Sequence, residues 1–241
     1  MVQKPLYPEG RETSHVVIVH APGGIAGGDE LAVDLRLHDN ARALLTTPAA
    51  GKWYKADGRE ARLHSRFAVA SGAVLEWLPQ ETIVFDAASA QIETEVTLAA
   101  NAVFAGWEIT CLGRRASGEC FTAGRLVQHL RILRGDRLIW NERLALRAGD
   151  RLMQSPVGLN GRHVTGTMVV AGRLPATLLD ACRAIGARRG EVGVTALPDV
   201  FAARYVGHSA EHARGYFESL RTVLRPWYAG RPAVRPRVWD T

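Results

Sequence analysis

The sequence predicts a mainly β fold with two α-helices in the C-terminal third. Through the first two-thirds of the chain, short segments alternate apolar and polar residues, which is typical of strands with one buried face. Turns rich in Gly, Asn and Asp separate these segments and indicate a largely antiparallel arrangement. Beyond about residue 175 the spacing of apolar residues becomes helical.

The clearest predicted strand covers residues 31–38, where leucine and valine alternate with polar residues. Further strands are expected, in chain order, at residues 41–47, 63–69, 73–78, 92–98, 102–112, 126–132, 138–146, 167–172, 192–197 and 201–206. One helix is expected over 175–189, with Pro175 in its first turn. A second helix is expected to begin after the capping residue Ser209 and to end at Pro226.

Composition and charge exclude several classes of protein. The chain has 241 residues, a net charge of +6 and a hydrophobic fraction of 47%, as expected of a globular protein. The arginines are spread along the chain without an aromatic-interleaved basic motif, which argues against nucleic-acid binding. A basic surface that docks an acidic protein partner explains the charge equally well.

The three cysteines are widely spaced without a Cys-x-x-Cys pair, which argues against disulfides and structural zinc and favours a reducing compartment. The first residues do not resemble a signal peptide, and no apolar run is long enough to span a membrane. We therefore expect a cytoplasmic protein that does not bind membranes.

A glycine-rich segment at residues 22–28, followed by Asp29, invites comparison with a phosphate-binding loop. Such a loop must open a helix, whereas the residues that follow alternate as a strand does. No Gly-Lys-Ser or Gly-Lys-Thr sequence occurs in the chain. The sequence therefore excludes nucleotide binding by a standard loop.

Histidines do not form a recognisable catalytic or metal motif. His208 and His212 have the spacing of neighbours on one helix face, but two ligands do not complete a metal site. We interpret them as a solvated helix start. No Ser-His-Asp arrangement or nucleophile elbow is present.

Three carboxylates stand out by their surroundings: Asp29 after the glycines, Glu108 in an apolar run, and Glu142 on the apolar face of its predicted strand. An unpaired buried charge is costly, so one interpretation is structural pairing with an arginine such as Arg114, Arg115 or Arg143. The other is a polar passage whose oxygen ligands suit transient contact with a divalent cation.

Lys52, Trp53 and Tyr54 lie in a short segment that places lysines around two aromatic residues. Trp and Tyr are favoured at protein interfaces, so these residues are candidates for binding a partner. The alternative is the start of a strand with one aromatic face buried.

Several short motifs occur in a fixed order along the chain: VQKPLYPEG (2–10), HAPGG (20–24), GGD (27–29), TTPAA (46–50), LEWLPQETI (75–83), FD (85–86), CLGR (111–114), LPD (197–199) and RPRVW (235–239), together with Lys52. Taken in this order, they resemble the UreD (UreH) family of urease accessory proteins. Two departures are expected from the family pattern: Gly51 replaces a hydroxyl residue, and members usually carry a further N-terminal segment before the counterpart of Val2.

The resemblance implies a superhelical stack of β-sheets forming a single domain over residues 1–241. It implies a scaffold and not an enzyme, acting with UreF-type and UreG-type proteins on apo-urease to install nickel. GTP would be used by the UreG-type partner, nickel would be in transit, and no cofactor would be tightly bound. The positions of Asp29, Glu108 and Glu142 match inward carboxylates of the family's proposed nickel passage.

Two hypotheses from other classes remain beside this one. A β-rich carbohydrate-active hydrolase could use paired carboxylates such as Asp29 and Glu142, which would then share one open pocket. A basic nucleic-acid-binding β domain would bind with a steep salt dependence.

Overall fold

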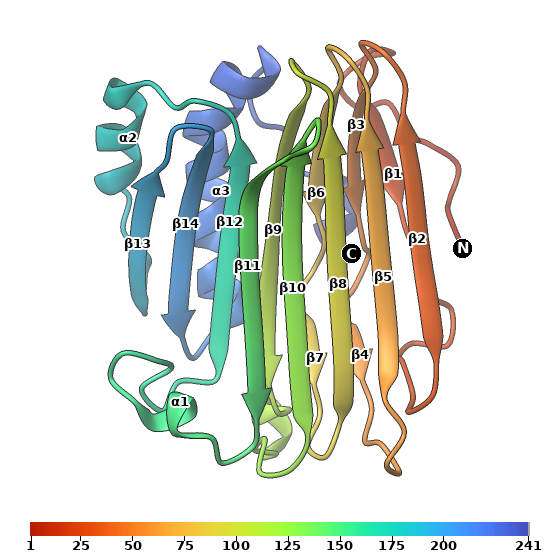
Figure 1. Ribbon diagram of the computed structural model, residues 1–241, viewed down its shortest axis with the longest axis vertical. Helices are drawn as coiled ribbons and strands as arrows, with labels where there is room; N and C mark the ends of the chain where they lie inside the picture. Colours follow the sequence, from red (N-terminus) through yellow and green to blue (C-terminus); the bar gives the residue numbers. More distant parts are fainter. Residues whose placement is uncertain (241) are drawn as a thin grey trace.

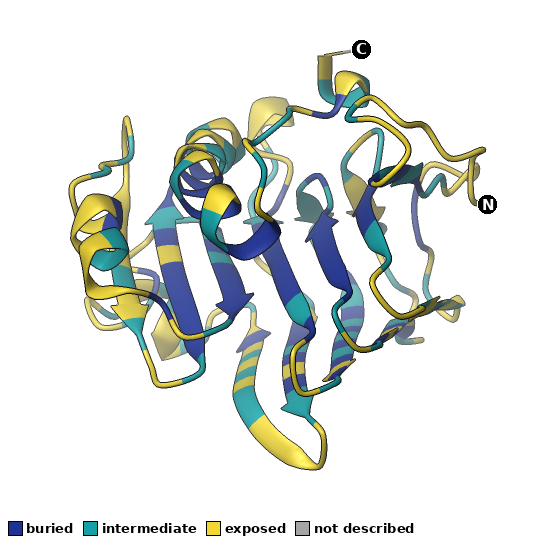
Figure 2. Cartoon of the chain, turned by 90° about the horizontal axis from the view of Figure 1, so that it is seen from above, coloured by how far each residue is buried: buried dark blue, intermediate teal, exposed yellow. Residues whose placement is uncertain are grey.

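Two β-sheets pack face to face, and a long helix, α3 (Ala210–Ala229), covers the outer face of the larger sheet (Figure 1). The computed structural model describes residues 1–240. Seen from above, dark buried strands fill the space beneath α3, while the free side of the smaller sheet is banded with exposed residues (Figure 2). The mainly β prediction is confirmed.

The larger sheet has nine strands. They are β1 (Ser14–Val17), β3 (Arg42–Thr46), β4 (Gly51–Trp53), β6 (Val74–Leu78), β7 (Thr82–Val84), β9 (Val103–Leu112), β12 (Val164–Ala171), β13 (Glu191–Ala196) and β14 (Val200–Gly207). The smaller sheet has five. They are β2 (Glu30–Leu37), β5 (Ala61–Val69), β8 (Ser89–Leu98), β10 (Arg125–Arg134) and β11 (Arg137–Arg147). No helix over residues 1–240 is both long and apolar enough to cross a membrane.

The expectation of a largely antiparallel arrangement is wrong. β1, β3, β6 and β9 pair in parallel, as do β2, β5, β8 and β10. From β2 to β10 the chain alternates between the two sheets, if β3 with β4 and β6 with β7 are each counted as one interrupted strand. The turns between these units therefore lead to the other sheet and do not form hairpins within one sheet. A strand that returns to its sheet one coil later runs in the same direction. Antiparallel pairing is confined to β10 with β11 and to β9, β12, β14 and β13.

Two strands of the larger sheet are interrupted at neighbouring points. β3 and β4 are separated by a segment containing Pro48, and β6 and β7 by one containing Pro79. Proline cannot donate a ladder hydrogen bond, so it ends regular pairing at both places. β6 pairs with β9 before the break, and β7 pairs with β9 after it. The breaks leave an irregular patch within the sheet.

The helices differ in extent from the prediction. α2 (Ala176–Arg183) ends earlier than expected, and α1 (Arg151–Gln154) is a single turn. α3 begins after Ser209, whose side chain accepts a hydrogen bond from the His212 N–H at 3.2 Å, as predicted. It does not end at Pro226 but continues for most of a turn, because the helix stops only where Gly230 adopts a left-handed conformation.

A buried network of charges joins α3 to the sheet beneath it. Glu76 on β6 accepts hydrogen bonds from the Arg221 Nε at 2.8 Å and the Arg225 Nε at 2.9 Å. The hydroxyl of Tyr228 donates to the same carboxylate at 2.7 Å. Arg225 also pairs with Glu9 at 2.6 Å, so the N-terminal segment is tied to the same helix.

Candidate functional site

Two cavities lie between the sheets and meet at Glu108 of β9 and Gln128 of β10. The first, the apolar cavity, has a volume of about 280 Å³ and extends toward β2, β5 and the strand breaks. The second, the polar cavity, has a volume of about 350 Å³ and lies between β10 and β11 on one side and β9, β12 and β14 on the other. The two cavities therefore share part of their lining.

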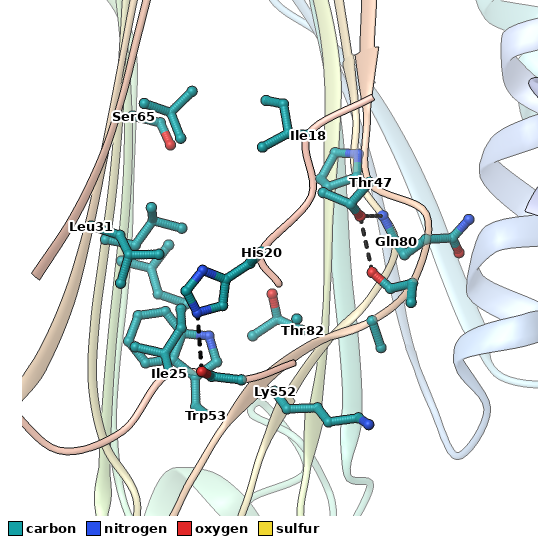
Figure 3. Close-up of a pocket in the computed structure, with 18 of the residues that line it drawn as sticks. Ile18, His20, Ile25, Leu31, Thr47, Lys52, Trp53, Ser65, Gln80 and Thr82 are labelled. Atoms are coloured by element: carbon teal, nitrogen blue, oxygen red, sulfur yellow. Dashed lines mark hydrogen bonds between the residues drawn. The ribbon is translucent and has the colours of Figure 1, made fainter. Parts of the chain in front are cut away.

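The apolar cavity owes its shape to the interrupted strands. The segments around Pro48 and Pro79 form part of its wall, and aliphatic side chains such as Leu31 and Ile18 form much of the rest (Figure 3). His20 lies in this wall, and its Nε2 is 3.1 Å from the Gly24 carbonyl oxygen. The Thr47 hydroxyl accepts a hydrogen bond from the Gln80 N–H at 2.9 Å and so connects the two breaks.

The polar cavity is lined by charged and hydroxyl-bearing side chains. Glu108, Thr167 and Arg204 form one row across β9, β12 and β14. From the opposite sheet, Glu142 accepts a hydrogen bond from the Thr167 hydroxyl at 3.1 Å and forms an ion pair with Arg204. The Glu142 side chain retains 21% of its exposure, so water can reach it.

Glu108 is held at the junction by residues of the smaller sheet. Its carboxylate accepts hydrogen bonds from the Thr94 hydroxyl at 3.0 Å and the Gln128 amide at 3.1 Å. Burial raises the pKa of Glu108 to about 7. The negative charge of Glu142 also raises this pKa, whereas the hydrogen bonds from Thr94 and Gln128 lower it. Glu108 is therefore a group that changes charge near neutral pH where the two cavities meet.

Replacing Glu108 by glutamine is expected to stabilise the protein above neutral pH by about 2–3 kcal/mol. A carboxyl group with a raised pKa in the folded state opposes folding once it ionises. The contribution of Glu108 should therefore lower the stability of the native chain as pH rises from about 4.5 to about 7, and should stay constant above that range. Urea denaturation across that range measures the decline. In the control Glu95→Gln, on the exposed outer face, the decline should persist; its persistence in Glu108→Gln would contradict the assignment.

The carboxylates that the sequence singled out are not all brought together. Glu108 and Glu142 both line the polar cavity, as their inward positions predicted. Asp29 lies in an exposed turn before β2, where it accepts a hydrogen bond from the Ala26 N–H at 2.8 Å, and lines neither cavity. The hydrolase hypothesis required Asp29 and Glu142 in one pocket, and they are not in one.

The expected arginine partners of the inward carboxylates are also wrong. Glu142 pairs with Arg204 of the other sheet, not with Arg143, which alternates to the opposite face of β11. Arg114 pairs with Glu119 at 2.7 Å near the surface. Residues 1–240 contain no cluster of three or more His, Cys, Asp or Glu side chains arranged to hold a metal ion.

The candidate partner-binding residues have different surroundings. Trp53 is only 2% exposed and forms part of the apolar cavity wall, as the alternative interpretation expected of a strand with a buried aromatic face. Tyr54 packs against Gly24, where an added Cβ would lie 2.4 Å from the ring, so this position requires glycine. Lys52 is exposed beside the cavity. A partner at this surface would contact Lys52 and Tyr54, and their role in binding remains a prediction.

Several residues that line the polar cavity were not recognised as functional candidates in the sequence. Gln128 falls on the same face of its strand as Leu126 and Leu130, and a polar residue in that position was a signal of an internal polar site. Thr167 and Arg204 gave no such signal, because their importance depends on which strands pair across the larger sheet.

The sequence is similar to proteins of one known family. The sequence matches the family described as "UreD urease accessory protein" over residues 1–240. "Urease accessory protein UreD" of Methylobacillus flagellatus is 53% identical over 243 residues, which cover all of this chain and 85% of that protein. Proteins of the same name from Azoarcus sp. and Pseudomonas aeruginosa are 48% and 46% identical, with the same coverage.

Proposed function

The chain belongs to the UreD family of urease accessory proteins, and from that premise we propose that it is a non-catalytic scaffold through which nickel reaches apo-urease. The pair of cavities that meet at Glu108 is the observation that carries this proposal. A passage lined by a few separated oxygen ligands gives a divalent cation places to pause without a closed site to retain it.

In this proposal nickel is cargo and the protein holds no resident cofactor. Glu108 and Glu142 supply carboxylate oxygens along the polar cavity, with Thr167 and Gln128 as neutral neighbours. The Arg204 guanidinium neutralises Glu142 when no cation is present, which limits the charge left inside the protein. Asp29, on the surface, would act at most before or after passage through the cavities.

The proposed partners are apo-urease and the UreF-type and UreG-type accessory proteins, in the cytoplasm. The UreG-type protein would hydrolyse GTP, and this chain would contribute the connecting passage and the docking surface. Nucleic acid and membranes have no part in this function.

The proposal is tested by deleting the gene from cells that express the urease operon and then restoring it. We expect urease activity to fall to the background of nickel-free enzyme, with urease protein still present, and to return on restoration. Measurement of nickel per purified urease separates a maturation defect from lost expression. Normal activity and nickel content without the gene would refute the maturation role.

A further inference from the structure

His163 and His208 form a pair at one end of the larger sheet. Val164 pairs with Gly207 across β12 and β14, so the two histidines are the next opposed residues beyond the ladder. Their Nδ1 atoms are 3.0 Å apart and their ring centroids 4.9 Å apart. His208 precedes the cap residue Ser209, so it does not lie on one face of α3 with His212 as the spacing suggested.

This separation suits shared coordination of a metal ion. Two imidazole nitrogens at about 2.1 Å from one ion, at angles between square and tetrahedral, lie about 3.0–3.4 Å apart. A hydrogen bond between the rings also gives this distance, but it uses one neutral ring as donor and the other as acceptor. Both nitrogens can therefore turn from each other to an ion with little movement of the backbone.

The pair also lies in line with the polar cavity. Side chains alternate along a strand, so His163 is on the same face of β12 as Thr165 and Thr167, both of which line that cavity. His208 has the same relation to Arg204 on β14. His163 is four residues before Thr167, which pairs with Glu108, so the two histidines lie about 13 Å along the strands from the row that contains Glu108. The start of β12 and the end of β14, which the two histidines directly adjoin, lie at the bottom of the molecule in Figure 1, at the same end as α1.

We propose that His163 and His208 form an open two-imidazole site for a divalent transition-metal ion such as Ni²⁺ or Zn²⁺, at the end of the gap between the sheets. Imidazole favours such ions over Mg²⁺ and Ca²⁺, which require oxygen ligands. Residues 1–240 provide no third protein ligand in a metal-binding arrangement, so water completes the coordination and leaves it exchangeable.

The electrostatic surroundings make binding reversible. Arg115 carries a positive charge close enough to His163 to act on it electrostatically, and this charge opposes a bound cation. This inference stands on the geometry of the pair and does not depend on the maturation role.

The test is calorimetric titration of the full chain, purified without a histidine tag, with Ni²⁺, Zn²⁺ and Mg²⁺ in turn. We expect one binding event for Ni²⁺ and for Zn²⁺ and none for Mg²⁺. His163→Asn and His208→Asn should each weaken the event by about tenfold or more, equivalent to ~1.4 kcal/mol. The control is His129→Asn, whose ring is bonded to Asn141 on the outer face of the smaller sheet.

A measurement on the unaltered chain covers the case in which a variant fails to fold. Zn²⁺ should shift the ¹⁵N resonances of the Nδ1 atoms of both histidines together in a nitrogen-selective NMR spectrum. Binding of Ni²⁺ that is equal in the chain and in both folded variants, or Zn²⁺ that leaves both resonances in place, would overturn the site.

Discussion

Glu76→Gln will lower the free energy of unfolding by about 3–5 kcal/mol, because it removes the negative member of a buried charge network. Arg221 and Arg225 are 3% and 1% exposed, and both donate to Glu76. Arg225 keeps Glu9 as a partner, whereas Arg221 keeps only the Val234 carbonyl oxygen among its hydrogen-bond acceptors on residues 1–240. A buried guanidinium without its carboxylate is the source of the loss.

Urea denaturation at neutral pH measures this loss, with Glu95→Gln as the control. Glu95 pairs with Arg131 on the outer face, where its side chain is 40% exposed, and an exposed pair contributes about 0–1 kcal/mol. A loss of less than 1 kcal/mol in Glu76→Gln would show that the network does not anchor α3.

The same variant should change the acid limb of the stability curve. Burial alone would raise the pKa of Glu76, but Arg221 and Arg225 outweigh it and hold the pKa below its ordinary value. A carboxyl group with a lowered pKa stabilises the fold above its unfolded pKa, and this contribution is lost as pH falls through the folded pKa. The native chain should therefore lose stability below about pH 4.5, and Glu76→Gln should lose less.

On the proposed maturation role, we expect Glu142→Ala to reduce the nickel content of urease by roughly tenfold, because it leaves Arg204 unbalanced beside the polar cavity. A cation entering the cavity would then meet a net positive charge instead of a neutral pair. Nickel per urease, measured on enzyme purified from cells carrying the variant, gives the effect. Binding of the UreF-type partner and of urease should be unchanged in a pull-down.

A paired variant separates the effect of charge from that of the carboxylate oxygen. Glu142→Ala with Arg204→Ala restores the charge balance of the cavity but not the carboxylate oxygen, so recovery of nickel content would assign the loss to charge, and no recovery would assign it to the missing oxygen ligand. Glu93→Ala, on the outer face of the smaller sheet, should have no effect. If Glu142→Ala abolishes partner binding as well, the residue is structural and the proposed passage loses its main support.

The positions of the strands could be predicted because alternation of apolar and polar residues is a local pattern. The pairing of the strands could not be predicted, because it depends on contacts between distant segments. The predicted strand at 31–38 is β2 to within one residue, and the alternation at 138–146 correctly placed Glu142 toward the interior. Whether neighbouring strands are parallel depends on whether the turn between successive strands stays in one sheet or leads to the other. The residues of the turn do not reveal which of the two occurs. The same limit concealed Arg204, which reaches Glu142 only through the order of β12 and β14.

The motif at residues 75–83 shows how a sequence signal can be recognised without its meaning. The motif contributed to the family resemblance, but the sequence did not assign separate roles to Glu76 and Pro79. Glu76 faces α3 and secures the helix, whereas Pro79 interrupts the strand and helps to form the apolar cavity. Its Pro79 carbonyl oxygen accepts a hydrogen bond from the buried Trp107 ring at 2.9 Å, which holds the break in place.

The link between Glu9 and Arg225 has a consequence for the order of folding during synthesis. Each coil of strands joins residues about 30 positions apart, so the stack can grow progressively as the chain leaves the ribosome. The contact between Glu9 and Arg225 spans 216 positions and cannot form until α3 has been made. Until then Glu9 and Glu76 lack their arginine partners on α3, and the face of the larger sheet that α3 covers is exposed. We therefore expect the buried charge network, and the docking of the N-terminal segment, to form only after α3 has been synthesised.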